Sequence, residues 1–131
     1  MATPHLPNLL LAGTGAAIGG ILRYLIGFAW LGAPAGAAFP WGTFLVNLTG
    51  CLAVGLFAAF VAPTGLSTDR RMMFLIVGVL GGYTTFSGFA LEVFRMIENG
   101  KAAQAIVYLG ATNSLCVFLA FAGLKLGRAL Q

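Results

Sequence analysis

The sequence predicts an all-α integral membrane protein with four transmembrane helices, and three observations support this fold class. Only 8% of the 131 residues are charged, whereas soluble domains carry roughly 25%. Hydrophobic residues make up 60% of the chain. They fall in four apolar runs, each meeting the requirement of about 20 residues for a helix that spans a bilayer. The composition therefore excludes an ordinary soluble enzyme, a disordered regulator and a disulfide-stabilised secreted domain.

The four predicted spans cover residues 9–31, 41–61, 72–96 and 102–126. They leave almost no chain for a soluble part, so we expect residues 1–131 to form a single membrane domain. No Lys or Arg precedes the first span, so we expect that span to be retained as a membrane helix rather than cleaved as a signal peptide.

Short polar or turn-forming segments separate the spans. Residues 32–40 form an uncharged link rich in Gly, Ala and Pro. Ser67, Thr68 and Asp69 precede the third span and can cap its first turn. Residues 98–100, Glu-Asn-Gly, predict a tight turn between the third and fourth spans.

Glycines recur at a spacing of four residues within the spans. The pairs are Gly15 with Gly19, Gly78 with Gly82, and Gly123 with Gly127. Such spacing lets helix backbones approach closely in lipid, so tight packing within or between subunits is expected.

Charge predicts the orientation only weakly. In a four-span chain both termini and the second loop share one side of the membrane. That side carries Arg70, Arg71, Lys125 and Arg128, and the other carries Arg95 and Lys101. So small a bias permits insertion in both orientations, the alternative being one orientation with cytoplasmic termini. The basic residues form no cluster beside an aromatic platform, which argues against nucleic acid as a partner.

No catalytic constellation is present in the sequence. His5 is the only histidine and precedes the first span, and no cluster of metal-ligating residues or phosphate-binding loop is found. Cys51 and Cys116 lie in apolar runs without CxxC spacing and are expected to be small packing residues. We therefore predict that the protein is not an enzyme.

The third span contains the least regular segment of the chain. Gly81 and Gly82 are followed by Tyr83, Thr84 and Thr85, a poor helix-forming sequence in the middle of an apolar run. We expect a break of the third helix near the bilayer centre, where freed backbone groups must be buried in protein or face a cavity or an ion. A continuous helix with a glycine-rich packing face is the alternative.

Three further features place polar or aromatic groups at membrane depth. Phe86 and Phe89 share one helix face, either for packing or to present their electropositive ring edges to an anion. Asn47 can form an interhelical hydrogen bond or donate to an anion. Arg23, within the first span, can extend to the interface or supply positive potential to an aqueous vestibule.

A polar stripe runs along the fourth span. Tyr108, Thr112 and Cys116 repeat every four residues. Hydroxyls can donate to a small anion without trapping it, although ordinary helix packing also explains the spacing, and Thr112 can bond its own backbone. Glu92 is the one acid inside an apolar run, and we expect it to pair with a basic or hydroxyl group or to lie near the membrane edge.

Together these segments resemble the Fluc-type (CrcB-like) fluoride ion channel family over nearly the whole chain. The segments that carry the resemblance are GAAIGGILRY (15–24), WGTFLVNLTG (41–50), GGYTTFSGF (81–89) and the stripe on the fourth span. The resemblance implies a multi-pass channel of the bacterial plasma (inner) membrane. It would give passive, fluoride-selective efflux and lower cytoplasmic fluoride.

The resemblance also implies an assembly and a site. The chain would form an antiparallel, dual-topology homodimer in lipid, with a structural Na⁺ at the dimer interface held by the backbone carbonyls of Gly81 and Thr84. Arg23 would lie in a vestibule. The fluoride pathway would be lined by Asn47, Phe86, Phe89, Thr85, Ser87, Tyr108, Thr112 and Cys116.

Three residues depart from the family pattern. Gly88 stands where many members have Ser or Thr, Cys116 stands where a hydroxyl is common, and Tyr83 replaces an aliphatic residue. A thiol is a weaker donor than a hydroxyl, so these departures bear on the polar track and on the rate of permeation.

Two other functions remain open from the residues. A small four-span proton-coupled exporter of lipophilic cations typically has a membrane-embedded carboxylate in its first span, which is missing here, and Glu92 would have to substitute. A membrane assembly factor without transport activity would associate with a larger complex and pass no ions.

Overall fold

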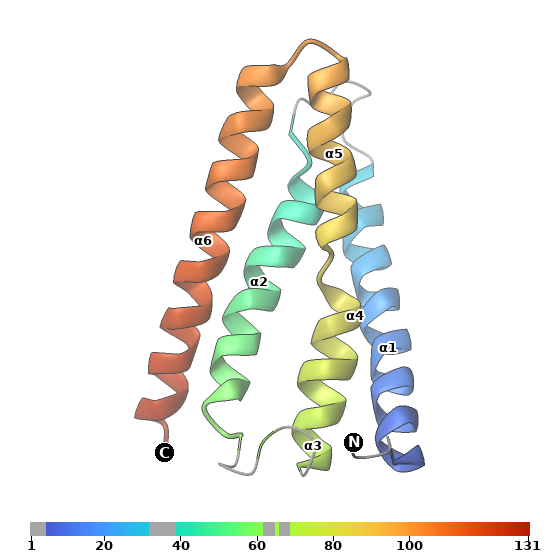
Figure 1. Ribbon diagram of the computed structural model, residues 1–131, viewed down its shortest axis with the longest axis vertical. Coiled ribbons are helices and arrows are strands. Elements are labelled where there is room, and N and C mark those ends of the chain that lie inside the picture. The colour runs from blue at the N-terminus through green and yellow to red at the C-terminus, as the bar shows by residue number, and fades with distance from the viewer. Residues whose placement is uncertain (1–4, 32–38, 62–64, 66–68) are drawn as a thin grey trace.

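The computed structural model describes residues 5–31, 39–61, 65 and 69–131. Every regular element in these residues is helical, and four helices are long and apolar enough to cross a membrane (Figure 1). Three spans are α1 (Leu6–Leu31), α2 (Trp41–Ala58) and α6 (Ala102–Ala129). The predicted all-α membrane fold is confirmed, with helix ends shifted by a few residues.

The third span is composite. It consists of α3 (Arg70–Met72), the π-helix η1 (Met73–Leu80), α4 (Gly81–Tyr83) and, beyond a break, α5 (Phe86–Glu98). The sequence pattern did not predict the π-helical segment. A π-helix has a wider turn than an α-helix and occurs frequently at functional sites, and this one leads directly to α4 and the break.

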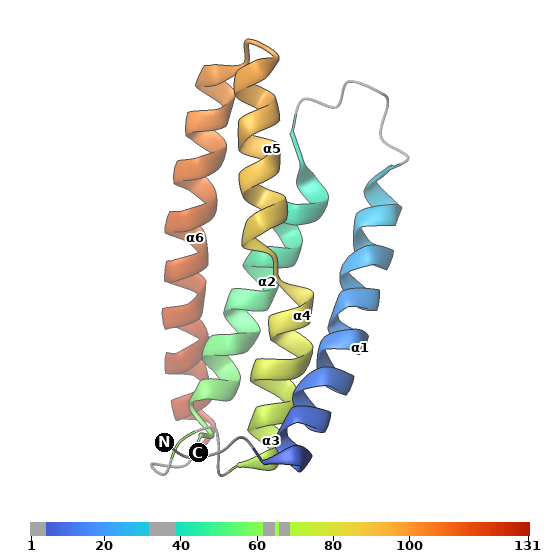
Figure 2. The ribbon, with the colours of Figure 1, turned by 45° about the vertical axis from the view of Figure 1, so that its right-hand side comes forward.

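The helices form an elongated bundle (Figures 1 and 2). The closest pairings are α2 along α6, and α1 along η1 and α4. The start of α1 and the C-terminus lie at one end of the bundle, and the turn between α5 and α6 lies at the other (Figure 1). This is the arrangement that four successive spans require.

Local sequence signals fix two helix ends. The Asp69 carboxylate accepts hydrogen bonds from the backbone N–H groups of Arg71 and Met72, at 3.0 and 3.2 Å, as an N-cap does. Ser67 and Thr68, and most of the link 32–40, lie outside the described residues. After α5, Gly100 adopts a positive φ of 73° and the Lys101 N–H bonds the Met96 carbonyl at 2.8 Å, which confirms the predicted tight turn.

Glycine is required where α1 crosses η1. A Cβ atom at Gly15 would lie 2.7 Å from the Phe74 carbonyl oxygen and 2.8 Å from the Gly78 Cα. Such approaches are too close for any side chain, so the backbones pack directly on one another. The predicted close helix packing is confirmed here.

Few apolar side chains are buried within one chain. The main buried cluster joins α5 to α6 and consists of Phe89, Met96, Ala105 and Tyr108. Large apolar side chains elsewhere point outward, among them Val117 at 72% and Phe118 at 62% exposure. In a multi-pass membrane protein such surfaces face lipid or another membrane-embedded chain, since a bilayer replaces water around the spans.

Candidate functional site

The third helix breaks at two threonines. Thr84 has ψ of 157° and Thr85 has φ of −149° and ψ of 118°, both extended, between α4 and α5. Gly81 and Gly82, which we expected to start the break, are still helical. The prediction of a break is confirmed, the alternative of a continuous helix is wrong, and the extended residues are the β-branched ones, which suit extended backbone.

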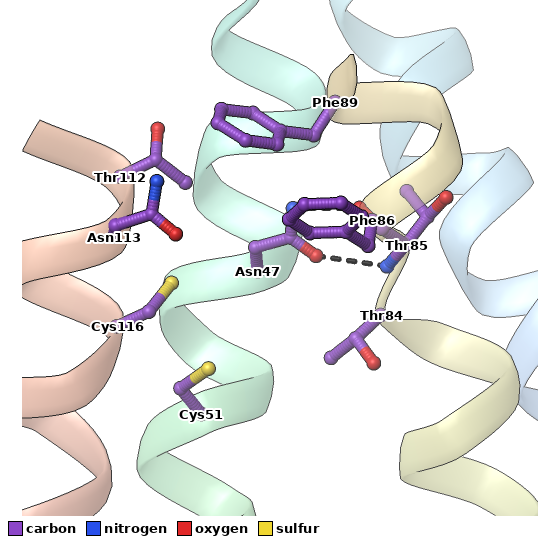
Figure 3. A pocket seen from close by; sticks show the side chains of 9 residues that line it. All are labelled: Asn47, Cys51, Thr84, Thr85, Phe86, Phe89, Thr112, Asn113 and Cys116. Atoms are coloured by element: carbon purple, nitrogen blue, oxygen red, sulfur yellow. Dashed lines mark hydrogen bonds between the residues drawn. The ribbon is translucent and has the colours of Figure 1, made fainter. Parts of the chain in front are cut away.

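The Asn47 side chain on α2 holds the break in its extended conformation through two hydrogen bonds. Its Nδ2 donates to the Thr85 carbonyl at 3.0 Å, and its Oδ1 accepts from the Thr85 N–H at 2.8 Å, the bond drawn as a dashed line in Figure 3. One side chain therefore satisfies both backbone groups of an extended residue, which lipid could not satisfy. The second Nδ2 hydrogen remains for another acceptor.

Thr85 also starts α5. Its Oγ1 accepts a hydrogen bond from the Gly88 N–H at 3.1 Å, the geometry of an N-cap. A Cβ at position 88 would lie 3.1 Å from this Oγ1. The departure from the family pattern at Gly88 thus leaves room for the cap.

On the other side of the break, backbone carbonyls lack their usual helical partners. The Thr84 N–H still donates to the Leu80 carbonyl at 3.0 Å, but the next N–H, that of Thr85, turns to Asn47. Carbonyls in the last turn of a helix lack intrahelical partners, and that of Gly81 falls in this turn. The Thr84 carbonyl accepts from the Arg23 guanidinium at 3.4 Å, so Arg23 lies beside the break.

A pocket of about 200 Å³ opens beside the break, between α2, α5 and α6 (Figure 3). Most of its lining residues were singled out by the sequence. The lining consists of Asn47, Cys51, Thr84, Thr85, Phe86, Phe89, Thr112, Asn113 and Cys116. Of the other pathway candidates, Ser87 and Tyr108 do not line it.

Thr112 stands out in the pocket wall. Its side chain is only 4% exposed, and its Oγ1 is buried without a hydrogen-bond partner in the part of the chain that the structure describes. The bond that it could form to its own backbone carbonyl is not made. A buried hydroxyl without a hydrogen-bond partner lowers the stability of the fold by about 1–3 kcal/mol. We therefore infer that a ligand or another chain supplies the partner.

Three aromatic rings contact one another in a row next to the pocket. Phe86 and Phe89 have ring centroids 5.7 Å apart, and the Phe89 ring contacts that of Tyr108 at 5.0 Å in an edge-to-face arrangement. Phe89 is 2% exposed and Phe86 is 75% exposed. Packing within the chain accounts for Phe89 but leaves the Phe86 ring uncovered.

Glu92 is held by two hydroxyls, as one of our expectations required. Thr43 donates to its Oε1 at 2.6 Å, and Tyr108 donates to its Oε2 at 2.8 Å. The Tyr108 hydroxyl proton is therefore committed to Glu92. The polar stripe on α6 divides into a part bound to Glu92 and a part, Thr112 and Cys116, that faces the pocket.

Sequence reasoning missed three residues of this region. Thr43 and Cys51 lie four residues before and after Asn47, so helical spacing alone places them on the face of α2 that carries Asn47. Asn113 follows Thr112 and lies at the pocket with its Nδ2 donating to the Leu109 carbonyl at 2.7 Å. No spacing signal distinguished it.

This fold and site define a small multi-pass membrane protein in which a broken third helix borders a polar pocket. Residues 10–124 match the family model described as CrcB-like protein, Camphor Resistance (CrcB). The chain belongs to this CrcB-like family.

Several relatives are named "Fluoride-specific ion channel FluC". The one from Rhizobium meliloti (strain 1021) is 44% identical over 123 residues, which cover 94% of this chain and 98% of the relative. Those from Rhizobium etli (strain ATCC 51251) and Agrobacterium fabrum (strain C58) are each 42% identical and cover 92% and 94% of this chain.

Proposed function

We propose that this protein is a fluoride-selective ion channel of a bacterial inner membrane that allows passive fluoride efflux and lowers cytoplasmic fluoride. Family membership and the names of the relatives support the ion. The observation that carries the proposal is the unpartnered, buried hydroxyl of Thr112, a residue that lines the pocket together with Asn47 and the break. The protein is a channel and not an enzyme.

The chemistry of the pocket suits a small, strongly hydrated anion. A pore must replace the water around such an ion with many donors, yet bind it weakly enough to release it. The Thr112 hydroxyl, the free Nδ2 hydrogen of Asn47 and the ring edges of Phe86 and Phe89 are neutral donors of this kind. We assign the pathway to these groups, with Thr85, Ser87, Tyr108 and Cys116 beside them.

We further propose that two chains pair antiparallel. The outward-facing Phe86 ring and the exposed Gly81 lie beside the break and would be covered by a second copy, and the weak charge bias permits both orientations. If so, a membrane-impermeant thiol reagent applied from one side should label about half of the chains that carry Gln131→Cys and no other cysteine. Labelling of all or none would contradict dual topology.

The carbonyls near the break fit a structural Na⁺. Hard cations prefer oxygen ligands, and carbonyls of unwound helix ends coordinate Na⁺ in other membrane proteins. The Gly81 carbonyl lies in the last turn before the break, and the Thr84 carbonyl, which accepts one bond from Arg23 at 3.4 Å, keeps its second lone pair for an ion. Two chains would supply four carbonyls, and the ion would add positive potential near the anion path.

Replacement of Na⁺ by a large organic cation should then slow fluoride flux, and unchanged flux would argue against this ion.

The central test is fluoride efflux from liposomes that contain the purified protein, followed with a fluoride electrode. We expect fast fluoride release and no matching release from vesicles loaded with chloride. No release from folded, dimeric protein in Na⁺ buffer would overturn the proposal. Proton-coupled export of a lipophilic cation would then be measured, with Glu92→Gln as the test variant.

Substitution of Phe86 by Ile should impair permeation about tenfold, because isoleucine fills space but has no electropositive ring edge. Phe94 provides a matched control, since it is also on α5 and 55% exposed but does not line the pocket. Phe94→Ile should leave the efflux rate near that of the wild type. Equal rates in both variants, with dimers intact by size-exclusion chromatography, would make Phe86 a packing residue only.

A further inference from the structure

Two thiols line the pocket, one from each of two adjacent helices. Cys51 on α2 lies one helical turn beyond Asn47, and Cys116 on α6 lies one turn beyond Thr112. Both are unbridged, partly buried and part of the pocket lining. Figure 3 shows both sulfur atoms projecting into the same space between the two helices.

Packing alone does not require this arrangement. The two helices approach closely through glycines, and two small apolar residues would fill the same space without polar atoms. The neighbouring Thr112 Oγ1, buried and unpartnered, also points to an absent ligand at this place. The thiols therefore lie in the same pocket as a hydroxyl that the described chain leaves unpaired.

We propose that Cys51 and Cys116 form a two-thiolate binding site for a soft monovalent cation of the Cu⁺ or Ag⁺ type. Thiolate sulfur selects soft cations over hard ones such as Na⁺. Among the described residues, no group of three or more His, Cys, Asp and Glu side chains is found, so a four-ligand zinc site is excluded there. Monovalent cations with a filled d shell bind readily to two sulfur ligands.

Binding changes the charge of the pocket. Each thiol releases its proton as its sulfur binds the metal, so one cation and two neutral thiols give a bis-thiolate complex of charge −1 and two protons. A net negative charge in a region of low dielectric repels a second anion strongly. The occupied site would therefore oppose fluoride passage, and this consequence rests on the proposed channel function.

The binding test uses Ag⁺ and does not depend on transport. Purified wild-type protein in chloride-free buffer is titrated with silver nitrate, while thiolate-to-metal absorbance and released protons are recorded. We expect saturation at one Ag⁺ per chain with release of two protons. Cys51→Ala and Cys116→Ser should each bind at least tenfold more weakly, because neither retains both ligands. Wild-type affinity in either variant would overturn the bridging site.

The double variant Cys51→Ala/Cys116→Ser is the control for binding of Ag⁺ to methionine. It keeps every methionine and should show no thiolate absorbance. Wild-type protein alkylated with N-ethylmaleimide is a second thiol-free sample that does not depend on folding of a variant. Tight Ag⁺ binding to both samples would place the metal elsewhere and contradict the proposal.

The transport test uses vesicles loaded with fluoride, since silver fluoride is soluble. The ratio of efflux rates with and without stoichiometric Ag⁺ should fall at least tenfold for the wild type, recover after addition of dithiothreitol, and stay near one for the double variant. Tight binding with an unchanged ratio would overturn the inhibitory consequence. An absence of efflux in every sample would contradict the channel function while the titration still reported on the thiol site.

Discussion

Substitution of Asn47 by Asp is expected to reduce fluoride efflux about 100-fold. The carboxylate keeps an acceptor for the Thr85 N–H but loses the donor to the Thr85 carbonyl, so two oxygens would oppose each other where a 3.0 Å hydrogen bond now lies. Asn47 is 7% exposed, and a buried acceptor without a donor costs about 3 kcal/mol, which corresponds to about 100-fold in rate.

The added charge acts in the same direction. A carboxylate in the pocket would repel the permeating anion, whereas the amide that it replaces is neutral. Both causes predict loss of flux, so the experiment needs a variant that separates them.

Asn113→Asp is that control. Asn113 also lines the pocket, but it is exposed and bonds only its own helix at the Leu109 carbonyl. The same change there adds the same charge and leaves the two hydrogen bonds between Asn47 and Thr85 in place. We expect a loss of less than about tenfold in this variant, as screening by solvent weakens an exposed charge. Equal losses in the two variants would assign the effect to charge alone, and wild-type efflux in Asn47→Asp would contradict any role of this amide as a donor.

The sequence predicted the fold because membrane burial imposes simple rules. Runs of sufficient apolar length define the spans, and glycines spaced four residues apart predicted close helix packing, which the structure contains where Gly15 meets Gly78. The break was predicted from Gly81 and Gly82, yet it occurs at Thr84 and Thr85. Glycine only permits a break, whereas the position of Asn47 on a neighbouring helix determines which residue is held extended.

Sequence patterns predicted only part of the candidate site, because they do not contain the tertiary packing that decides which polar groups are paired. Periodicity places Thr112 and Cys116 on one face of α6, but it does not reveal which hydroxyls are already paired. Glu92 takes the Tyr108 proton and leaves that of Thr112 free, a division set by the packing of α5 against α6. The presence of Cys51 and Cys116 in one pocket likewise depends on how two helices distant in sequence are aligned, which no local pattern specifies.

Substitution of Thr112 by Val should have opposite effects on stability and transport. Valine has nearly the shape of threonine without the hydroxyl, and the Thr112 Oγ1 has no partner within the described chain. Removal of an unsatisfied buried polar group should stabilise the protein by about 1 kcal/mol. If the hydroxyl donates to permeating fluoride, the same change should slow efflux about tenfold, since one donor to an ion is worth about 1.5 kcal/mol.

Thr49→Val is the matched control, because Thr49 shares the chemistry but not the place. Its Oγ1 donates to the Leu45 carbonyl at 2.7 Å and lies 2.9 Å from the Tyr83 hydroxyl, and it is absent from the pocket lining. We expect this variant to be slightly less stable and to conduct fluoride nearly as fast as the wild type. Thermal unfolding in detergent and efflux from liposomes measure the two quantities separately. A destabilised Thr112→Val protein would reveal a structural partner for the hydroxyl, and wild-type efflux would remove Thr112 from the pathway. A more stable protein that conducts poorly would identify the unpaired hydroxyl as a group retained for transport at the expense of stability.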